Sequence, residues 1–298
     1  MERIGKYVIH KAAVTTGYAR VFFCHDPDLQ VPVAVKVFQP KAGEEGEQLM
    51  SPAQLLTRFL VEARALAAFD HPYIIPVKSL DRTEGGVPFF VMPFQAAHLA
   101  YEIGRDGEAA TDAPEHDRPR RMPLPRAVMV LRQLAAALAA LHRRGMVHRA
   151  VKPSNVLLTA RENGAARLAD FSTIKLPEKN PPLPDHWIGG TEYCAPEQRE
   201  NATGVGPQAD VFSLGVLAYR MVAGRLPDLS AGPAVLAEGP AELAALVRAA
   251  TDPDPAGRPA HGGAMLDALA KVPAAARPAV QVLTVKKPQV RRATAPAG

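Results

Sequence analysis

The chain has 298 residues, of which 47% are hydrophobic and 22% are charged, the composition of a globular protein that is long enough for a substantial core. The formal net charge of +5 comes from 35 basic and 30 acidic residues, and no run of lysine or arginine exceeds two. Such a small excess argues against a nucleic-acid-binding protein. The two cysteines, Cys24 and Cys194, make neither a disulfide framework nor a metal-binding pattern, which is typical of a reducing compartment.

The first residues carry no apolar signal segment, and the longest apolar stretches lie around 134–141 and 211–219. Both are far shorter than the roughly 20 residues that a membrane-spanning helix needs. The sequence therefore predicts a cytoplasmic protein without a membrane span.

Residues 1–92 alternate short β-type runs with turns. Runs rich in β-branched and aromatic residues predict strands at 21–23, 33–38, 74–77 and 87–92. After a charged loop at 41–50, Ser51 and Pro52 suit the cap and first turn of a helix, and apolar residues then recur at spacings of three and four up to Ala67. This combination predicts a β-rich region with one main helix.

The pattern from residue 93 to residue 272 is mainly helical. The strongest apolar periodicities cover 126–144, 210–223, 241–250 and 264–269. A polar stretch at about 104–122 interrupts this region and is predicted to be a surface loop. The last residues, 273–298, are rich in alanine and proline with scattered lysine and arginine, which predicts a disordered basic tail.

The most informative segment runs from His148 to Asn155. It resembles the catalytic loop of serine/threonine protein kinases, H-R-D-x-K-x-x-N, in which the aspartate accepts the proton of the substrate hydroxyl. Ala150 stands in place of that aspartate, and its methyl group can neither take a proton nor orient a hydroxyl. Lys152 matches the lysine that is typical of serine/threonine enzymes.

Four more residues match the nucleotide site of this family. Lys36 ends a Val-Ala-Val-Lys run that resembles V-A-I-K, whose lysine binds phosphates, and Glu62 on the predicted helix matches the glutamate that holds this lysine. Asn155 and Asp170 match the two residues that ligate magnesium, although Ser172 replaces the glycine of the family's D-F-G motif. The resemblance therefore implies that ATP and Mg²⁺ bind between these side chains.

Further motifs resemble the supporting framework of the family. Residues 190–197 are similar to the end of the activation segment, which closes in A-P-E. Asp210 matches the aspartate that holds the catalytic loop, and Arg258 matches the arginine that pairs with the A-P-E glutamate, here Glu197. On these ordered motifs the chain is identified as a member of the bacterial (Hanks-type) serine/threonine kinase family. The resemblance implies an α+β fold with two lobes, a β-rich small lobe over 1–92 and a mostly helical large lobe over 93–272.

The glycine-rich loop of the family, G-x-G-x-x-G-x-V, is the second departure. Val14, Thr16 and Ala19 fall on its three glycine positions, and Val21 keeps the valine. The resemblance places these four residues, together with Met92, in the nucleotide site. Glycines let backbone N–H groups approach phosphates closely, so these replacements predict a weaker hold on the nucleotide. The alternative is a hairpin that simply covers the cleft.

The two departures together predict a pseudokinase, a kinase fold that binds ATP and Mg²⁺ weakly and acts as a signalling or scaffold module. Two alternatives stay open: a weakly active serine/threonine kinase that transfers the γ-phosphate of ATP, and transfer of AMP by a kinase-like cleft. Expected partners are the nucleotide and other proteins, such as an active kinase or its substrate.

Two segments of the sequence resemble sites of phosphorylation in other proteins. In the family, the arginine at the position of Arg149 pairs with a phosphate on the activation segment, and Thr173 and Thr191 are the nearest acceptors here. If catalysis is lost, local packing and hydrogen bonding are the favoured role for Arg149. The tail segment 291–294 resembles a site for a basophilic kinase, but short basic tripeptides with threonine are common.

Overall fold

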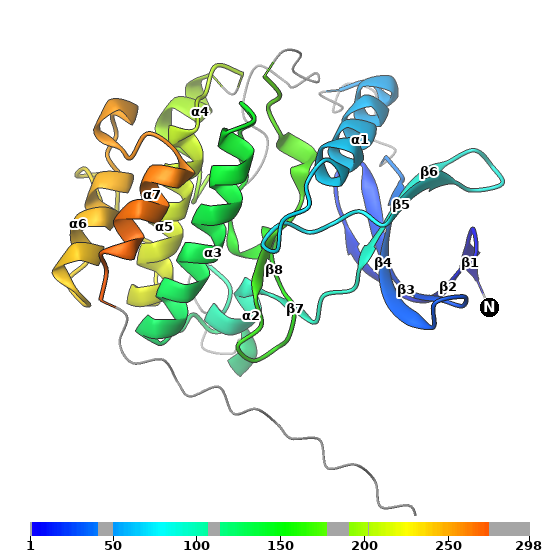
Figure 1. Cartoon of the computed structure of the whole chain (residues 1–298), viewed down its shortest axis with the longest axis horizontal. Coiled ribbons are helices and arrows are strands. Elements are labelled where there is room, and N and C mark those ends of the chain that lie inside the picture. Colours follow the sequence, from blue (N-terminus) through cyan, green and yellow to red (C-terminus); the bar gives the residue numbers. More distant parts are fainter. Residues whose placement is uncertain (1, 41–49, 107–113, 178–190, 202, 274–298) are drawn as a thin grey trace, which may run out of the picture.

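The computed structural model describes residues 2–40, 50–106, 114–177, 191–201 and 203–273. An antiparallel six-stranded sheet and one long helix form one end of the molecule. The remaining helices and a three-stranded sheet form the other end (Figure 1). The predicted bilobal α+β architecture is thereby confirmed.

The small-lobe sheet has the strand order β1-β2-β3-β4-β6-β5. Its strands are β1 (Arg3–Ile4), β2 (Tyr7–Thr15), β3 (Ala19–Asp26), β4 (Val31–Phe38), β5 (Ser79–Arg82) and β6 (Pro88–Pro93). Successive side chains of a strand point to opposite faces. Val33 and Val35 therefore join a small core on one face, whereas Lys36 lies on the other face beside its cross-strand partner Phe90.

Helix α1 (Pro52–Ala67) begins where the capping signal predicts. The Ser51 side chain accepts from the N–H of Gln54, and the Gln54 side chain accepts from the N–H of Ser51. Phe59 and Glu62 are buried on the inner side of the helix, and the Phe59 ring packs 5.2 Å from the Phe90 ring, centroid to centroid. The helix thus brings Glu62 to the same face of the sheet as Lys36.

The strand predicted at 74–77 is wrong. Ile74 makes only an isolated bridge to Leu168, and the outer strand that pairs with β6 at the edge of the sheet is β5, which starts at Ser79. Ile74 and Ile75 are buried, and the N–H of Ile75 donates to the carbonyl of Leu168 in the large lobe. Pro76 then lacks an N–H and cannot continue a ladder, so the apolar run serves as packing between the lobes.

The large lobe contains all four helices that the periodicity predicts, and no helix end differs from its prediction by more than two residues. Its helices are α2 (Leu99–Ile103), α3 (Leu124–His142), α4 (Pro196–Glu200), α5 (Gln208–Ala223), α6 (Ala241–Ala250) and α7 (Gly262–Ala270). The small sheet consists of β7 (Ala97–His98), β8 (Val156–Leu158) and β9 (Ala166–Leu168). Helix α5 is buried along nearly its whole length, and a Cβ on Gly215 would come within 2.7 Å of Ala250 on α6. Helices α5 and α6 therefore pack closely against each other in the core of the large lobe.

Both ends of the polar stretch predicted at 104–122 are held against the large lobe. The buried Arg220 on α5 pairs with Asp106, and Asp106 also accepts a hydrogen bond from the Tyr193 hydroxyl at 2.7 Å. On the other side, Arg120 donates to the carbonyl of Glu102 at 2.8 Å. The middle of the stretch, 107–113, lies outside the described residues, as do the loop at 41–49 and the tail at 274–298.

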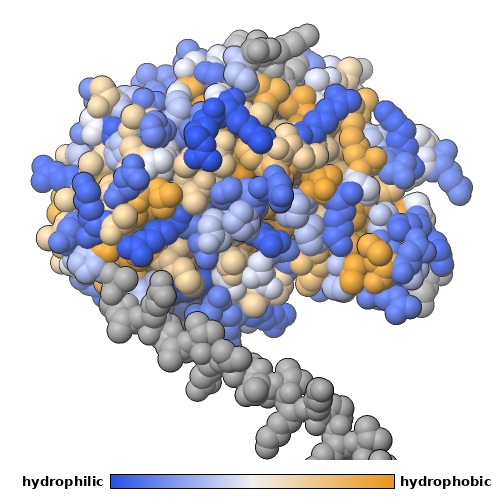
Figure 2. Space-filling view, in the orientation of Figure 1, coloured by the Kyte–Doolittle hydropathy of each residue, from blue (hydrophilic) through white to orange (hydrophobic). Residues whose placement is uncertain are grey.

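Among the described residues, α3 is a single helix whose length and apolar composition would suit a membrane span. Two thirds of this apolar window, 67%, is buried inside the protein, which is the behaviour of a core helix. On the face shown in Figure 2, hydrophobic side chains gather in several places among hydrophilic ones. Because most of helix α3 is buried in the protein, this helix is only weak evidence for a membrane protein.

Candidate functional site

Lys36 and Glu62 form a buried ion pair behind the sheet of the small lobe. The Lys36 Nζ lies 2.7 and 2.8 Å from the two carboxylate oxygens of Glu62 and 3.5 Å from Asp170 Oδ1 of the large lobe. The side chains of Lys36 and Glu62 are at most 5% exposed, whereas that of Asp170 is 31% exposed. Three residues that are far apart in the sequence therefore meet as the resemblance predicts.

The charges of Lys36 and Asp170 favour each other's ionised state. Burial by itself lowers the pKa of Lys36, but the negative charges of Glu62 and Asp170 outweigh it and raise the pKa above its ordinary value. For Asp170, burial favours the neutral acid, yet the Lys36 charge and a hydrogen bond from the Ser172 side chain keep its pKa below the ordinary value. A positively charged lysine beside an ionised aspartate suits a phosphate and a metal ion.

The backbone of the catalytic-loop segment is hydrogen-bonded to one buried carboxylate. Asp210 on α5 is fully buried and accepts hydrogen bonds from the N–H groups of His148 and Arg149 at 2.8 and 2.7 Å. It also lies 2.9 Å from His142 Nε2. Burial alone would raise the pKa of Asp210, but its hydrogen bonds with the His142 side chain and the His148 N–H lower it. Asp210 therefore acts as an ionised anchor for the loop.

Two residues of the site have backbone angles in the left-handed region. Arg149 has φ 67° and Asp170 has φ 62°. Such angles are unfavourable for residues other than glycine and persist only where the surroundings impose them. The Asp210 contact imposes the angle at Arg149, and at Asp170 the bend sends the carboxylate toward Lys36. The loop geometry is thus maintained although Ala150 supplies no acid–base group.

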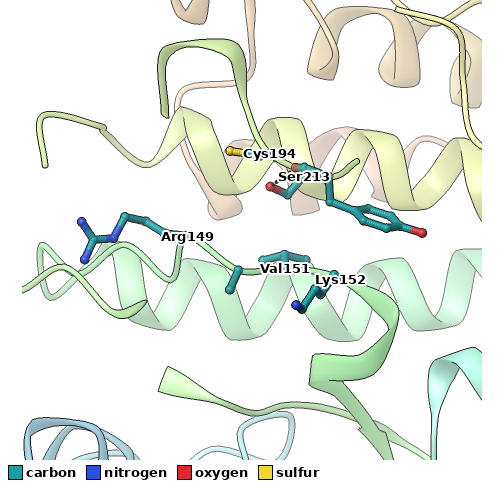
Figure 3. Close-up of a pocket in the computed structure, with 7 residues that line it drawn as sticks. Arg149, Val151, Lys152, Cys194 and Ser213 are labelled. Atoms are coloured by element: carbon teal, nitrogen blue, oxygen red, sulfur yellow. Dashed lines mark hydrogen bonds between the residues drawn. The ribbon is translucent and has the colours of Figure 1, made fainter. Parts of the chain in front are cut away.

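A small cavity opens beside Ala150 (Figure 3). Val151 and Lys152 lie on one side of it, and Cys194 and Ser213 lie on the other. Its volume of about 20 Å³ is room for a water molecule or a hydroxyl group. Ala150 is part of the lining, whereas Lys36, Asn155 and Asp170 are not, so the cavity is separate from the charged and oxygen-bearing side chains described above.

Asn155 and Asp170 are brought together by the pairing of β8 with β9. Val156 faces Leu168 in this pair, and the N–H of Ala169 donates to the carbonyl of Asn155 at 2.9 Å. The side-chain NH₂ of Asn155 donates to the carbonyl of Ala150 at 2.9 Å. This bond fixes the orientation of the amide, whose oxygen can act only as an acceptor or a metal ligand. Amide and carboxylate oxygens are the ligands that Mg²⁺ prefers, so this donor set fits the ion.

No described residues form a cluster of three or more histidine, cysteine, aspartate or glutamate side chains that could hold a metal without help. A Mg²⁺ ion held by Asn155 and Asp170 would take its remaining oxygen ligands from phosphate groups and water. This dependence is typical of Mg²⁺ that arrives with a nucleotide.

The residues that fall on the glycine positions lie in and around the turn between β2 and β3. Val14 is 56% exposed at the end of β2, Thr16 is half-buried, and Ala19 is fully buried at the start of β3. Val21 is half-buried opposite Lys36 in the β3–β4 pair. Met92 on β6 is buried in the main core. The turn therefore lies at the Lys36 end of the sheet.

The A-P-E glutamate and its arginine form the pair that the resemblance implies. Arg258 donates to both carboxylate oxygens of Glu197, at 2.7 and 2.9 Å. This two-bond geometry is among the stronger side-chain interactions. It ties α4 (Pro196–Glu200) to the loop after α6 and so fixes the segment that follows the cavity.

Sequence reasoning missed Arg58 and Tyr18. Arg58 lies one helical turn before Glu62 and donates to the carbonyl of Ser172 at 2.8 Å, while Arg149 donates to the carbonyl of Thr173 at 2.6 Å. Burial, together with the charge of Arg58, lowers the pKa of Arg149 to about 9. The spacing of four between Arg58 and Glu62 is the signal that could have found the first. Tyr18 donates to Glu62 from the β2–β3 turn, and its sequence context gave no such signal.

The two candidate phosphate acceptors differ, because the Thr173 hydroxyl is hydrogen-bonded within the protein whereas Thr191 is exposed to solvent. The Thr173 hydroxyl donates to the carbonyl of His148 at 3.0 Å, whereas Thr191 is exposed. The segment between them, 178–190, lies outside the described residues.

Comparison with known proteins agrees with this geometry. A family model described as "Protein kinase domain" matches residues 15–251, which include every site residue above except Val14 and Arg258. The chain belongs to the protein kinase family. The Lys36–Glu62 pair and the loop held by Asp210 both lie within the matched residues.

The chain is similar to bacterial serine/threonine protein kinases. It is 33% identical over 228 residues to the kinase pkn2 of Myxococcus xanthus, covering 75% of this chain and 25% of that protein. Its identity to PknL of Mycobacterium tuberculosis is 32% over 289 residues, covering 89% of this chain and 66% of PknL. For PknA of the same organism the identity is 30% over 292 residues, covering 92% and 63%. The chain thus spans between a quarter and two thirds of the length of these relatives.

The crystal structure of the kinase domain of PknI from Mycobacterium tuberculosis has the same fold. It superposes with a TM-score of 0.62 and covers 90% of this chain and 96% of the PknI domain, at 24% sequence identity. The bilobal architecture is therefore that of a solved bacterial kinase domain.

Proposed function

We propose that this chain is a pseudokinase domain that holds ATP and Mg²⁺ weakly and serves as a signalling or scaffold module for other proteins. The observation that carries the proposal is Ala150 on an otherwise anchored catalytic loop. Asp210 fixes the loop backbone at the two residues directly before this position, so the loss concerns the reacting group and not the scaffold.

The magnitude of the loss favours a binding role. Removing a positioned general base typically slows a reaction by about 10²- to 10⁴-fold. No Asp or Glu lines the cavity at Ala150, and Asp170 is engaged with Lys36. His148 is buried, and its ring nitrogens contact the N–H of Ala150 and the carbonyl of Ala169. Neither residue therefore replaces the carboxylate that is missing at position 150.

The retained site residues supply the nucleotide part of the proposal. Lys36 offers positive charge for phosphates, and Asn155 with Asp170 offers oxygen ligands for Mg²⁺. When ATP·Mg²⁺ is bound, the metal neutralises phosphate charge, and the protein positions the triphosphate.

A weakly active serine/threonine kinase is the second candidate, and the assembled Lys36–Glu62–Asp170 constellation favours it. Phosphoryl transfer depends mainly on positioning and charge stabilisation, so residual activity is chemically reasonable without a general base.

Two measurements test the proposal. In thermal unfolding with ATP, we expect a rise in Tm that requires Mg²⁺ and disappears in Lys36→Met and Asp170→Asn; no rise under any condition would remove the nucleotide from the proposal. Incubation with γ-labelled ATP and a general acceptor protein should give no label above background. Label that depends on Lys36 would establish the weak kinase instead, and label from α-labelled ATP would indicate AMP transfer.

A further inference from the structure

Tyr18, at the turn between β2 and β3, reaches down to the buried ion pair. Its hydroxyl donates to Glu62 Oε2 at 3.1 Å, and the Lys36 Nζ lies 5.7 Å from the centre of its ring. Tyr18 is half-buried although it lies in a turn that begins with exposed residues. A residue of the covering turn therefore contacts the group that would receive the phosphates.

The Lys36 ammonium already has a full set of acceptors. An ammonium carries three N–H donors, and three carboxylate oxygens lie at 2.7, 2.8 and 3.5 Å. The rings of Tyr18 and Phe90 are also near this ammonium, with their centres 5.7 and 5.8 Å from Nζ. A phosphate oxygen that approached Lys36 would have to displace one of these neighbours.

Backbone N–H groups of the turn also make hydrogen bonds within the turn. The N–H of Thr16 donates to the carbonyl of Ala19 at 2.8 Å, and the N–H of Ala19 donates to Thr16 Oγ1 at 3.1 Å. The carbonyl of Tyr18 accepts from the N–H of Gln39 at 2.9 Å. Phosphate-binding loops use free backbone N–H groups. Here two of those donors are closed into the turn, which holds Tyr18 in its inward position.

We propose that Tyr18 is an internal competitor for the triphosphate end of the cleft, so that ATP binds only when the Tyr18–Glu62 hydrogen bond is broken. The inference rests on the proposed nucleotide-binding function and adds the residue that sets its selectivity between triphosphate and nucleoside. A nucleoside such as adenosine has no group for the Lys36 end, and its binding does not require Tyr18 to move.

The contact is stable at ordinary pH. Burial raises the pKa of the Tyr18 phenol well above its usual range, and the charges of Glu62 and Asp170 raise it further. The phenol therefore stays protonated and continues to donate to the glutamate.

The test measures binding of ATP·Mg²⁺ and of adenosine by calorimetry for four proteins: the wild type, Tyr18→Phe, Tyr18→Ala and the control Tyr101→Ala. Tyr101 is 42% exposed on α2 and lies outside the cleft residues described above. Tyr18→Phe removes only the hydrogen bond to a charged group, so ATP affinity should rise about tenfold or more. Tyr18→Ala should gain at least as much, whereas adenosine should change by less than about twofold in every variant. Urea unfolding of each protein verifies that the fold is kept.

Three outcomes overturn the proposal. If ATP affinity is unchanged or falls in both Tyr18 variants while the wild type binds ATP, this proposal fails and the nucleotide-binding function stands. If adenosine gains as much as ATP, the turn covers the whole cleft and does not select against phosphates. If ATP binds to none of the four proteins, both this proposal and the nucleotide part of the proposed function fail.

Discussion

The two ends of the site differ in what they have kept. Beneath the catalytic loop, Asp210 and the Glu197–Arg258 pair make the contacts that the kinase resemblance implies. At the phosphate end, Thr16 and Ala19 replace glycines and bond to each other, and Tyr18 occupies the space beside Lys36. Both ends thus keep buried charges, but the scaffold end keeps the contacts that the family resemblance implies, whereas at the phosphate end the turn that covers Lys36 has lost its glycines and contributes a side chain to the ion pair.

The largest effect should come from Asp210→Ala, which removes the anchor of the scaffold end. The substitution leaves two buried backbone N–H groups and His142 without their acceptor, so we expect a loss of about 3–5 kcal/mol in the free energy of unfolding. Urea denaturation measures it. The exposed Asp267 on α7 is the matched control, and Asp267→Ala should change stability by less than about 0.5 kcal/mol. Equal effects for the two variants would remove the anchor role.

A smaller loss should follow from Arg258→Ala. Glu197 keeps partial access to solvent, with 25% of its side chain exposed, so it can be rehydrated when its partner is removed. We expect about 2–3 kcal/mol by urea denaturation. The double substitution Arg258→Ala/Glu197→Ala should cost less than the two single ones added together, because the pair is coupled. Additive losses would show that the two side chains act independently.

Lys36→Met probes the phosphate end and should cost about 1–3 kcal/mol, less than the loss of Asp210. The substitution leaves Glu62 buried without a cation, but burial already raises the pKa of this carboxyl above its ordinary value, so it can take up a proton. Combining Lys36→Met with Glu62→Leu should recover stability, since both charges then disappear. A double variant that is less stable than Lys36→Met alone would contradict this account.

The smallest effect concerns pH. Burial lowers the pKa of His148 below the ordinary value of 6.5. Its contribution is therefore complete above that ordinary value and is lost as pH falls from about 6.5 toward the folded-state pKa. Between pH 7.5 and 5.5 we expect the free energy of unfolding to drop by about 1 kcal/mol. The drop should shrink in His148→Gln but persist in His10→Gln, an exposed position. An equal drop in all three proteins would assign it to other groups, such as His71 and His98, whose pKa values burial also lowers.

Sequence reasoning found the scaffold because its signals are local. Asp210, Glu197 and Arg258 each lie in a short motif with a fixed spacing, and α1 has both a capping signal and an apolar stripe. Met92 could be placed in the site only through the resemblance, since a buried methionine has no pattern of its own.

What the sequence could not give was set by contacts between distant segments. The run at 74–77 has the composition of a strand, yet its partner is Leu168 in the other lobe. Tyr18 and Glu62 are far apart in the chain, and only the folded sheet and α1 bring the hydroxyl to the carboxylate. The pairing of Asp106 with Arg220 depends in the same way on tertiary structure.

Restoring the missing acid–base group tests the central claim most directly. Transfer of label from γ-labelled ATP to a general acceptor is measured at saturating ATP·Mg²⁺ for the wild type and for Ala150→Asp. The anchored loop predicts that Ala150→Asp transfers phosphate at least about 10²-fold faster than the wild type, whose rate stays at background. Transfer by the wild type at a rate equal to that of Ala150→Asp, and lost in Lys36→Met, would contradict the account.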